Sequence, residues 1–149
     1  MQAATAVVSE VEHPELPDSY RPRESEPFMN ERQLEYFRQK LLAWKDDILR
    51  ESRETLGHLQ TETENHPDDA DRASSETDRA LELRTRDRQR KLIAKIEAAI
   101  RRVEDGSYGY CEDTGEPISL ARLEARPIAT LSLEAQERHE RKERVHRDD

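Results

Sequence analysis

Hydrophobic residues recur at intervals of three and four positions in the region that follows residue 30. The apolar positions of this first run are Leu34, Phe37, Leu41, Trp44 and Ile48. This spacing places the apolar side chains along one side of an α-helix, and mostly polar or charged residues fill the other positions. The pattern predicts an amphipathic helix that packs its apolar stripe against a partner helix.

Local capping signals mark where this helix begins. Asn30 can act as the N-cap, with Gln33 at the position of a capping box and with Met29 and Leu34 at the positions of a hydrophobic staple. The preceding residues, 1–29, contain four of the seven prolines and show no helical period. They predict an irregular N-terminal arm that packs on the globular part of the protein, with its first residues disordered.

A second helical pattern follows a short turn. His66-Pro67 interrupts the first pattern because a residue before proline disfavours the helical conformation. We expect Asp71 to be the N-cap of the second helix and Asp105-Gly106 to end it. The apolar stripe of this helix consists of Leu81, Leu92, Ile96, Ile100 and Val103.

Two one-sided helices joined by a short turn predict an antiparallel coiled-coil hairpin over residues 30–105, with an acidic tip at residues 66–73. Beyond it, turn residues and small apolar groups predict a compact region at residues 106–131 and a helix over residues 132–149. The fold class is therefore mainly α: a long hairpin, a small globular region and a C-terminal helix. The apolar residues expected to pack the compact region are Leu120, Leu123, Ile128, Leu131 and Leu133.

Composition narrows the possible functions. The 149 residues are 33% hydrophobic and 40% charged, as expected for a thin, solvated architecture. The net charge of −9 argues against a protein that wraps nucleic acid, so we expect no sequence-specific DNA binding. A single cysteine excludes an intramolecular disulfide and fits a reducing compartment. Without a secretory signal or an apolar membrane-spanning segment, the sequence predicts a cytoplasmic protein, which we expect to be a monomer.

Few residues suggest chemistry of their own. The histidines are scattered without metal-ligand spacing, and we expect them to be solvated surface residues. No nucleophile elbow or phosphate-binding loop is present in the sequence, so an enzyme is not indicated. The basic stretch "RTRDRQRKLIAKIE" is typical of a solvated helix face. Its alternative interpretation is an anion site where Lys95 and its neighbours meet the "LEARP" segment.

Three long segments, "MNERQLEYFRQKLLAWKDDILRE", "HPDDADRASSETDRALELRTRDRQRKLIAKIEAAIRRVEDGSYGYC" and "LEARP", resemble the DksA family of RNA-polymerase-binding transcription factors. The resemblance runs from about residue 15 to the carboxyl end. It implies a hairpin that enters the secondary channel of RNA polymerase and, with ppGpp, destabilises open promoter complexes. Ribosomal RNA promoters would be repressed and some amino-acid promoters activated, as in the stringent response. The implied tip residues are Asp68, Asp71 and Ala73.

The resemblance also implies contacts on the second helix and beyond it. Arg84 and Arg88 match positions that contact polymerase. A lysine of the C-terminal helix in the family pattern is replaced here by Gln136, although Arg138 lies on the same helix. The remaining positions implied for ppGpp, at the polymerase interface, are Leu92, Lys95 and Arg126.

Family members hold the compact region with four cysteines around zinc. The matching positions here are Cys111, Thr114, Ser132 and Ala135. One thiolate, two hydroxyls and a methyl do not form a structural zinc site, so the resemblance implies a zinc-finger-like region that is ordered without zinc.

Cys111 has two interpretations, a small buried hydrophobic residue or a thiol that senses oxidation or nitrosation. Its neighbours Glu112 and Asp113 are expected to raise the pKa of the thiol and to make it less reactive.

Two other functions remain open at this stage. A Gre-type channel factor uses a similar hairpin and an acidic tip to promote transcript cleavage, but its terminal domain is not zinc-finger-like. A structural coiled-coil adaptor would not contact polymerase at all. Transcript cleavage on backtracked complexes distinguishes the first alternative, and an unchanged transcription phenotype of Asp71→Asn would favour the second.

Overall fold

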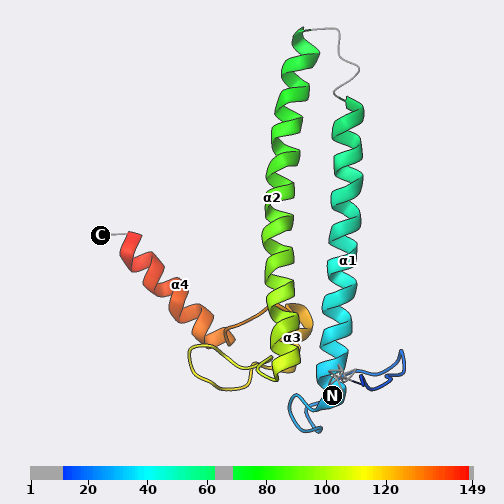
Figure 1. Cartoon of the computed structure of the whole chain (residues 1–149). Helices are drawn as coiled ribbons and strands as arrows, with labels where there is room; N and C mark the ends of the chain where they lie inside the picture. Colours follow the sequence, from blue (N-terminus) through cyan, green and yellow to red (C-terminus); the bar gives the residue numbers. More distant parts are fainter. Residues whose placement is uncertain (1–11, 63–68, 148–149) are drawn as a thin grey trace, which may run out of the picture.

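The computed structural model describes the backbone of residues 12–62 and 69–147 and the side chains of residues 12–57 and 72–146. Figure 1 shows two long helices side by side, and two shorter helices near one end of the pair. The two long helices run antiparallel, as the sequence predicted, and the fold is mainly helical. The helices are α1 (Glu31–Glu62), α2 (Asp69–Asp105), α3 (Leu120–Ala125) and α4 (Leu133–Arg147).

The hairpin has two different ends. Because α1 and α2 contain 32 and 37 residues, they extend about 48 and 56 Å at 1.5 Å per residue. We call the end that carries the rest of the chain the base; it comprises residues 12–48 and 92–147. The distal half comprises the described residues 49–62 and 69–91. None of the helices in the described parts of the chain is long and apolar enough to cross a membrane.

The start of α1 is capped by its own side chains. Gln33 donates its backbone N–H to Asn30 Oδ1 (2.9 Å), as a capping box requires. The return bond differs from the prediction, because Gln33 Oε1 accepts from the N–H of Met29 (2.9 Å) instead of that of Asn30. The buried Gln33 amide also donates to the carbonyl of Arg23 (3.1 Å). One side chain therefore caps the helix and holds the arm.

The sequence predicted one end of α2 correctly and the other wrongly. The prediction that Asp71 is the N-cap was wrong, because the helix already begins at Asp69. Aspartate is as suitable in the first turn of a helix as at its N-cap, so residue type did not fix the boundary. At the other end, Gly106 has φ 82° and follows the last helical residue, as predicted. Ser107 N–H donates to Arg102 O (3.0 Å) and Gly106 N–H to Val103 O (3.4 Å), which forms a Schellman motif.

The buried core lies in the base. On α1 the predicted stripe is buried at Phe37, Leu41 and Ile48 and half-buried at Leu34 and Trp44. On α2 the stripe holds except at its distal end, where Leu81 is 54% exposed and the prediction of a core position was wrong. Leu49, Leu56 and Leu83 are also exposed, so the distal half offers little apolar surface for burial. The buried hydrophobic residues are Met29, Phe37, Leu41, Ile48, Ile96, Ala99, Val103, Tyr108, Cys111, Ile118, Leu123, Ala129 and Ala135.

Residues 106–131 form a turn-rich unit on the base. An antiparallel bridge joins Tyr110 to Pro117, and Gly115 N–H donates to Cys111 O (2.8 Å) to close the turn between them. The short helix α3 follows and was not predicted from the sequence. Its N-cap Ser119 accepts from Arg122 N–H (3.2 Å), a signal that the sequence contains but that a six-residue helix makes easy to overlook.

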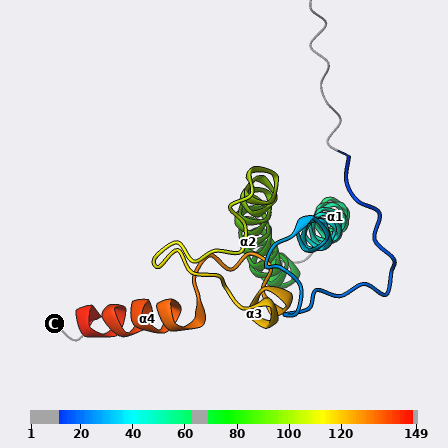
Figure 2. The same ribbon diagram turned by 90° about the horizontal axis from the view of Figure 1, so that it is seen from below.

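Helix α4 leaves the base and points away from the hairpin (Figures 1 and 2). Ser132 caps it by accepting from Ala135 N–H (3.2 Å). The prediction that Leu133 packs the compact region was wrong, since its side chain is 59% exposed. The reason is geometric: α4 turns its Ala135 side into the core, and Leu133 lies on a different side of the helix. His139 Nε2 lies 2.7 Å from Asp113 Oδ2 and ties the helix to the turn, so this histidine has a partner that the sequence did not suggest.

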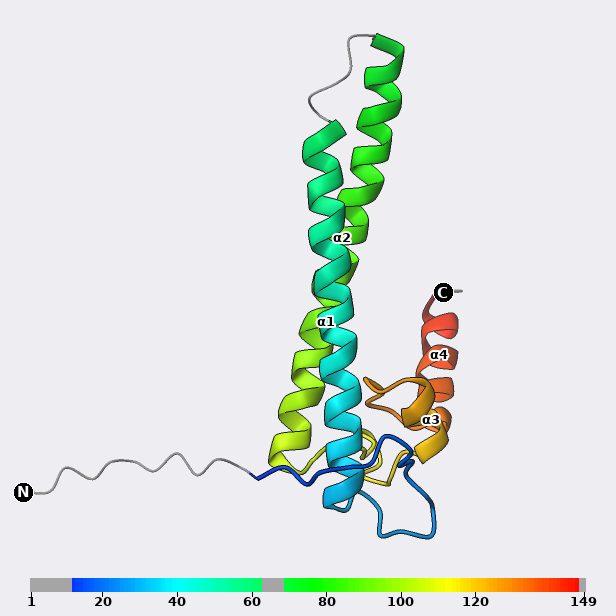
Figure 3. The same ribbon diagram turned by 90° about the vertical axis from the view of Figure 1, so that its right-hand side faces the viewer.

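The described part of the arm, residues 12–30, is irregular and runs along the start of α1 (Figure 3). Phe28 and Tyr110 meet edge to face with ring centroids 5.3 Å apart. Tyr36 of α1 donates its hydroxyl to Glu124 Oε1 (2.5 Å), and Lys40 Nζ lies 2.8 Å from the same oxygen. Burial and the Glu124 carboxylate raise the pKa of Tyr36 to about 12, so its phenol remains a hydrogen-bond donor at neutral pH.

Candidate functional site

The predicted acidic tip is only partly visible. Asp68 lies outside the described residues, and the backbone of Asp71 lies in the first turn of α2. Ala73 is exposed, and its carbonyl accepts from the Thr77 hydroxyl (3.0 Å). Asp71 and Ala73 therefore lie at the end of α2 that is farthest from the base.

A basic surface follows along the distal half of α2. Arg84 and Arg88 are exposed and line one open groove with Lys91 and the exposed Leu81. Arg88 Nη2 lies 3.3 Å from Thr85 Oγ1, and this hydroxyl in turn donates to Leu81 O (3.0 Å). The two arginines predicted to contact polymerase thus share a surface with an apolar side chain, which the sequence stripe had placed in the core.

A second, cationic cavity lies within the base, between the end of α2, α3 and the start of α4. Its volume is about 180 Å³. Lys95, Ala98 and Arg102 lie on one side of α2, at successive spacings of three and four residues. The other lining residues are Arg122, Arg126, Ile128, Ala129, Thr130, Leu131 and Gln136. We refer to it as the cationic cavity.

The structure brings together two of the three residues that the resemblance assigned to ppGpp, Lys95 and Arg126. Leu92 is half-buried against the core and does not belong to the described lining of the cavity. Arg102 and Arg122 were missed from the sequence. The signal for Arg102 was its spacing of seven from Lys95, which keeps the two residues on one side of α2. Arg122 lies four positions before Arg126, the C-cap of α3.

Backbone groups fix the geometry of the cavity wall. Arg122 Nε donates to Leu131 O (2.9 Å), which orients the guanidinium. The N–H of Arg126 donates to Arg122 O (2.7 Å) and caps α3. Tyr108 donates its hydroxyl to Pro127 O (2.6 Å) from within the core. The loop that follows α3 is therefore held by hydrogen bonds from both sides.

The four positions that the resemblance matches to zinc ligands form a different cluster here. Cys111 is only 2% exposed, and Thr114 and Ser132 hydrogen-bond its sulfur through both hydroxyl and backbone N–H groups. Burial alone would raise the pKa of the thiol, but these donors outweigh it and lower the pKa to about 6. The expectation of a raised pKa was wrong, because it rested on neighbours in sequence and not on the donors that surround the sulfur.

This cluster does not suit zinc. Structural zinc sites use four ligands from cysteine, histidine or carboxylate side chains, and Ala135 offers none. The hydroxyls of Thr114 and Ser132 already bond the sulfur, and Ser132 Oγ also accepts from the α4 backbone. Across the side chains that the structure describes, no group of three or more histidine, cysteine or acidic residues could hold a metal ion.

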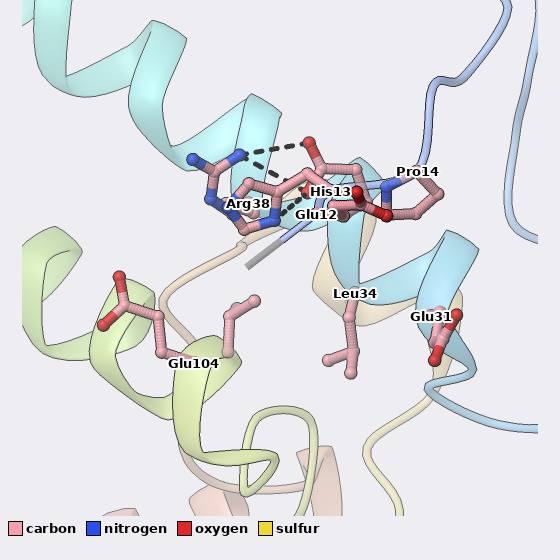
Figure 4. A pocket seen from close by; sticks show the side chains of 9 residues that line it. Glu12, His13, Pro14, Glu31, Leu34, Arg38 and Glu104 are labelled. Atoms are coloured by element: carbon pink, nitrogen blue, oxygen red, sulfur yellow. Dashed lines mark hydrogen bonds and ion pairs between the residues drawn. The ribbon is translucent and has the colours of Figure 1, made fainter. Parts of the chain in front are cut away.

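A further cavity of about 260 Å³ lies between the arm and the base of the hairpin (Figure 4). His13 Nδ1 lies 3.2 Å from the buried Glu35, whose carboxylate also accepts from Arg38 (3.1 Å) and Gln39 (3.0 Å). This histidine is therefore partnered, not freely solvated as predicted. The network holds the arm against α1, and both carboxylate oxygens of the buried Glu35 have partners.

The fold and these surfaces define a class of protein: a helical hairpin that projects from a small base and presents binding surfaces along its length. Residues 33–103 match the N-terminal domain of the DnaK suppressor protein DksA, and residues 106–141 match the prokaryotic dksA/traR C4-type zinc finger. The chain is 76% identical, over the full length of both proteins, to the RNA polymerase-binding transcription factor DksA of Caulobacter vibrioides. The chain belongs to the DksA family.

More distant relatives support the same assignment. The DksA protein of Escherichia coli is 47% identical over 117 residues, which cover 78% of each chain. The structure of the transcription factor DksA2 from Pseudomonas aeruginosa is similar with a TM-score of 0.75 and 41% identity, covering 80% of this chain and 95% of that one. The likeness in structure therefore extends over most of the chain.

Proposed function

We propose that this protein is a cytoplasmic, non-enzymatic transcription regulator that binds RNA polymerase as a monomer and acts through the secondary channel. The full-length identity of 76% to a relative named as an RNA polymerase-binding transcription factor carries the proposal. The long hairpin gives it a physical basis, because a rod of about 50 Å can carry a tip deep into a channel while the base stays outside.

In this proposal the tip acts on the polymerase active centre. Asp68, Asp71 and Ala73 lie at or beyond the start of α2, and negative charge there would disturb a centre that handles metal ions and nucleic acid. Arg84 and Arg88 would hold the rod in the channel, since both are exposed on α2. ppGpp would join at the polymerase interface next to Leu92, Lys95 and Arg126. The expected outcome is weaker open complexes at ribosomal RNA promoters and activation of some amino-acid promoters.

The base would remain folded without zinc. Two observations support this: hydrogen bonds to the Cys111 sulfur connect it to Thr114 and Ser132, and Tyr108 and Ile118 are fully buried beside this cluster. These contacts would take the place of the bonds to zinc. A redox role of Cys111 would depend on access to its sulfur, which is almost fully buried in this conformation.

The test is transcription in vitro from a ribosomal promoter by the cognate polymerase, with and without ppGpp, in the presence of a strong zinc chelator. Wild type should inhibit under all these conditions, and Asp71→Asn should lose most of the inhibition. Asp78→Asn is the matched control, because it removes one carboxylate from an exposed position two turns farther along α2.

The outcomes separate the alternatives. Inhibition that requires added zinc would contradict zinc independence while leaving the channel mechanism intact. Stimulated transcript cleavage in backtracked complexes would identify a Gre-type factor instead. No effect of the wild-type protein in either assay would leave a coiled-coil adaptor as the better account.

A further inference from the structure

The interface between α1 and α2 changes from apolar to polar halfway along the hairpin. On α2, residues spaced seven apart lie on one side of the helix. This row consists of Val103 and Ile96 in the base and of Gln89 and Glu82 in the distal half. Val103 and Ile96 are buried, and Gln89 and Glu82 are half-buried. The two polar residues therefore occupy positions of the helix interface that the base fills with apolar side chains.

Helix α1 shows the same change. Its corresponding row consists of Leu41 and Ile48, which are both buried, followed by the half-buried Thr55. Across the interface, Ser52 donates its hydroxyl to Gln89 Oε1 (2.7 Å). One such hydrogen bond contributes less net stability than the burial of a pair of large apolar side chains. The distal half of the interface is therefore held together more weakly than the half in the base.

Glu82 makes the closed interface unfavourable. Among the described residues, its Oε2 atom is the only buried side-chain oxygen or nitrogen without a hydrogen-bond partner. Water hydrates this carboxylate oxygen when the two helices move apart, so opening removes the penalty of leaving it buried and unpaired. An interface that served rigidity alone would have an apolar residue here, as the base has at Ile96.

The base has contacts that do not depend on the distal half. In Figures 1 and 3, no described element other than α1 and α2 extends along the distal half. Separation of the helices there breaks the bond between Ser52 and Gln89 but leaves the bonds of Tyr36 and Lys40 to Glu124 in place. Local opening requires less free energy than global unfolding where few buried apolar contacts are lost.

We propose that the distal half of the hairpin opens as a separate unit, and that this opening lets the tip end of the rod adjust to the cavity it enters. The helices move apart beyond Ile48 and Leu92 while the base stays folded. Glu82 favours the open state, and the bond between Ser52 and Gln89 fixes the register in which the helices close again. The adjusting role rests on the proposed function, in which the cavity is the secondary channel; the opening itself does not.

Native-state hydrogen exchange of the full chain tests the opening without polymerase. After correction for intrinsic rates, amides of residues 79–90 should exchange at least about tenfold faster than those of residues 96–103. Leu41→Ala removes a buried side chain of the base and should speed exchange in residues 96–103 while leaving residues 79–90 unchanged. If Leu41→Ala speeds exchange equally in both ranges, the hairpin opens as one unit and the proposal is overturned.

Apolar residues at the polar positions should keep the distal half closed. Glu82→Leu removes the unpaired carboxylate and should slow exchange of residues 79–90 about tenfold. Ser52→Ala combined with Gln89→Leu replaces both partners of the bond by apolar groups of similar shape and should also slow it. Glu76→Leu is the matched control, because it makes the same change at an exposed position of α2 and should have no effect. Slower exchange cannot result from misfolding, and unchanged exchange in Glu82→Leu would overturn the role of Glu82.

Inhibition of a ribosomal promoter with the cognate polymerase tests the adjusting role. Glu82→Leu and the double variant should both need a several-fold higher protein concentration for half-maximal inhibition than wild type or Glu76→Leu. The double variant is included because it closes the interface without changing Glu82.

The outcomes separate this inference from the proposed function. Weaker inhibition by Glu82→Leu alone would indicate a direct contact of Glu82 with polymerase and overturn the adjusting role. Inhibition by both variants that equals or exceeds that of wild type would overturn it as well. If wild type does not inhibit, the proposed function and the adjusting role fail together, whereas the exchange rates still decide whether the distal half opens as a separate unit.

Discussion

The base and the distal half of the hairpin use the same two helices but are held together by different means. In the base, Phe37, Leu41 and Ile96 are fully buried, and aromatic rings from the arm and the turn region pack around them. In the distal half, Leu56 and Leu81 remain exposed, and a polar bond from Ser52 Oγ to Gln89 Oε1 (2.7 Å) joins the helices. Stability is thus concentrated where the chain is folded around the hairpin, and the rest of the rod presents surface for other molecules.

The difference teaches that one heptad-like pattern can serve two purposes. An apolar stripe contributes to stability only where a partner surface covers it, at about 25 cal/mol per Å² of buried apolar area. Within the base, the arm and residues 106–131 cover apolar surface that the other helix leaves open. Farther out only two helices meet, and exposed leucines remain available for contacts with a partner.

The largest effect is expected from core truncation in the base. Phe37→Ala should lower the free energy of unfolding by about 3–5 kcal/mol, because a fully buried ring leaves a cavity. Leu81→Ala in the distal half should change it by less than about 0.5 kcal/mol. Chemical denaturation followed by circular dichroism measures both. Equal losses would show that the distal half is as tightly packed as the base.

A smaller effect is expected from Gly109→Ala, where the base approaches the start of α1. Gly109 has φ 92°, and a methyl group there would lie 3.1 Å from side-chain carbons of Met29. The left-handed conformation alone costs about 1–2 kcal/mol for a residue with a Cβ, and the Met29 contact adds to it. Gly115→Ala is the control, with φ 72° and open space around the added carbon. If both variants lose the same stability, the Met29 contact is unimportant.

The free energy of unfolding should fall at low pH because of Cys111, which lies in the base of the hairpin. The pKa of Cys111 in the folded state, about 6, lies below the ordinary value of 9.0, so folding stabilises the deprotonated form of the thiol. The resulting stability is fully present above about pH 9 and is lost as the pH falls through about 6. In reducing buffer, the difference in Tm between wild type and Cys111→Ala should therefore grow in favour of wild type as pH rises across this window. Thr114→Val, which removes a hydroxyl donor, should shift the window upward, and a pH-independent difference would argue against a stabilised thiolate.

The smallest effect, of opposite sign, is expected in the distal half. Gly57→Ala places a methyl in open space within α1 and should raise the free energy of unfolding by about 0.5–1 kcal/mol. Thermal unfolding of this variant beside Gly115→Ala compares one substitution in a helix with the same substitution in a left-handed turn. A loss of stability at position 57 would reveal contacts that tighten the rod there.

The sequence predicted where the long helices lie better than it predicted which of their side chains are buried. The α1 stripe from Leu34 to Ile48 and the stop at Gly106 depend on local periodicity and local backbone preference, and both were correct. Leu81 and Leu133 were misplaced because their exposure depends on whether another element covers them, which periodicity does not report. The six-residue α3 is too short to show a period at all.

The candidate sites show the same division. Lys95 and Arg126 followed from motifs that can be read along the chain, but Arg102 and Arg122 became part of a site only when α2 and α3 were placed together. The thiol of Cys111 was judged by Glu112 and Asp113, which adjoin it in sequence. Its actual environment includes Ser132, which lies 21 positions farther along the chain.

The bonds of Tyr36 and Lys40 to Glu124 join residues that are 88 and 84 positions apart. Synthesis proceeds from the amino terminus, so α1 emerges from the ribosome long before its acidic partner has been made. Both long helices can be synthesised before residues 106–131 have been made, because a contact between distant residues forms only when both residues are present. A polypeptide that stops short of residue 124 would retain the rod but lack this fastening. Formation of these bonds therefore marks the point at which translation has passed residue 124.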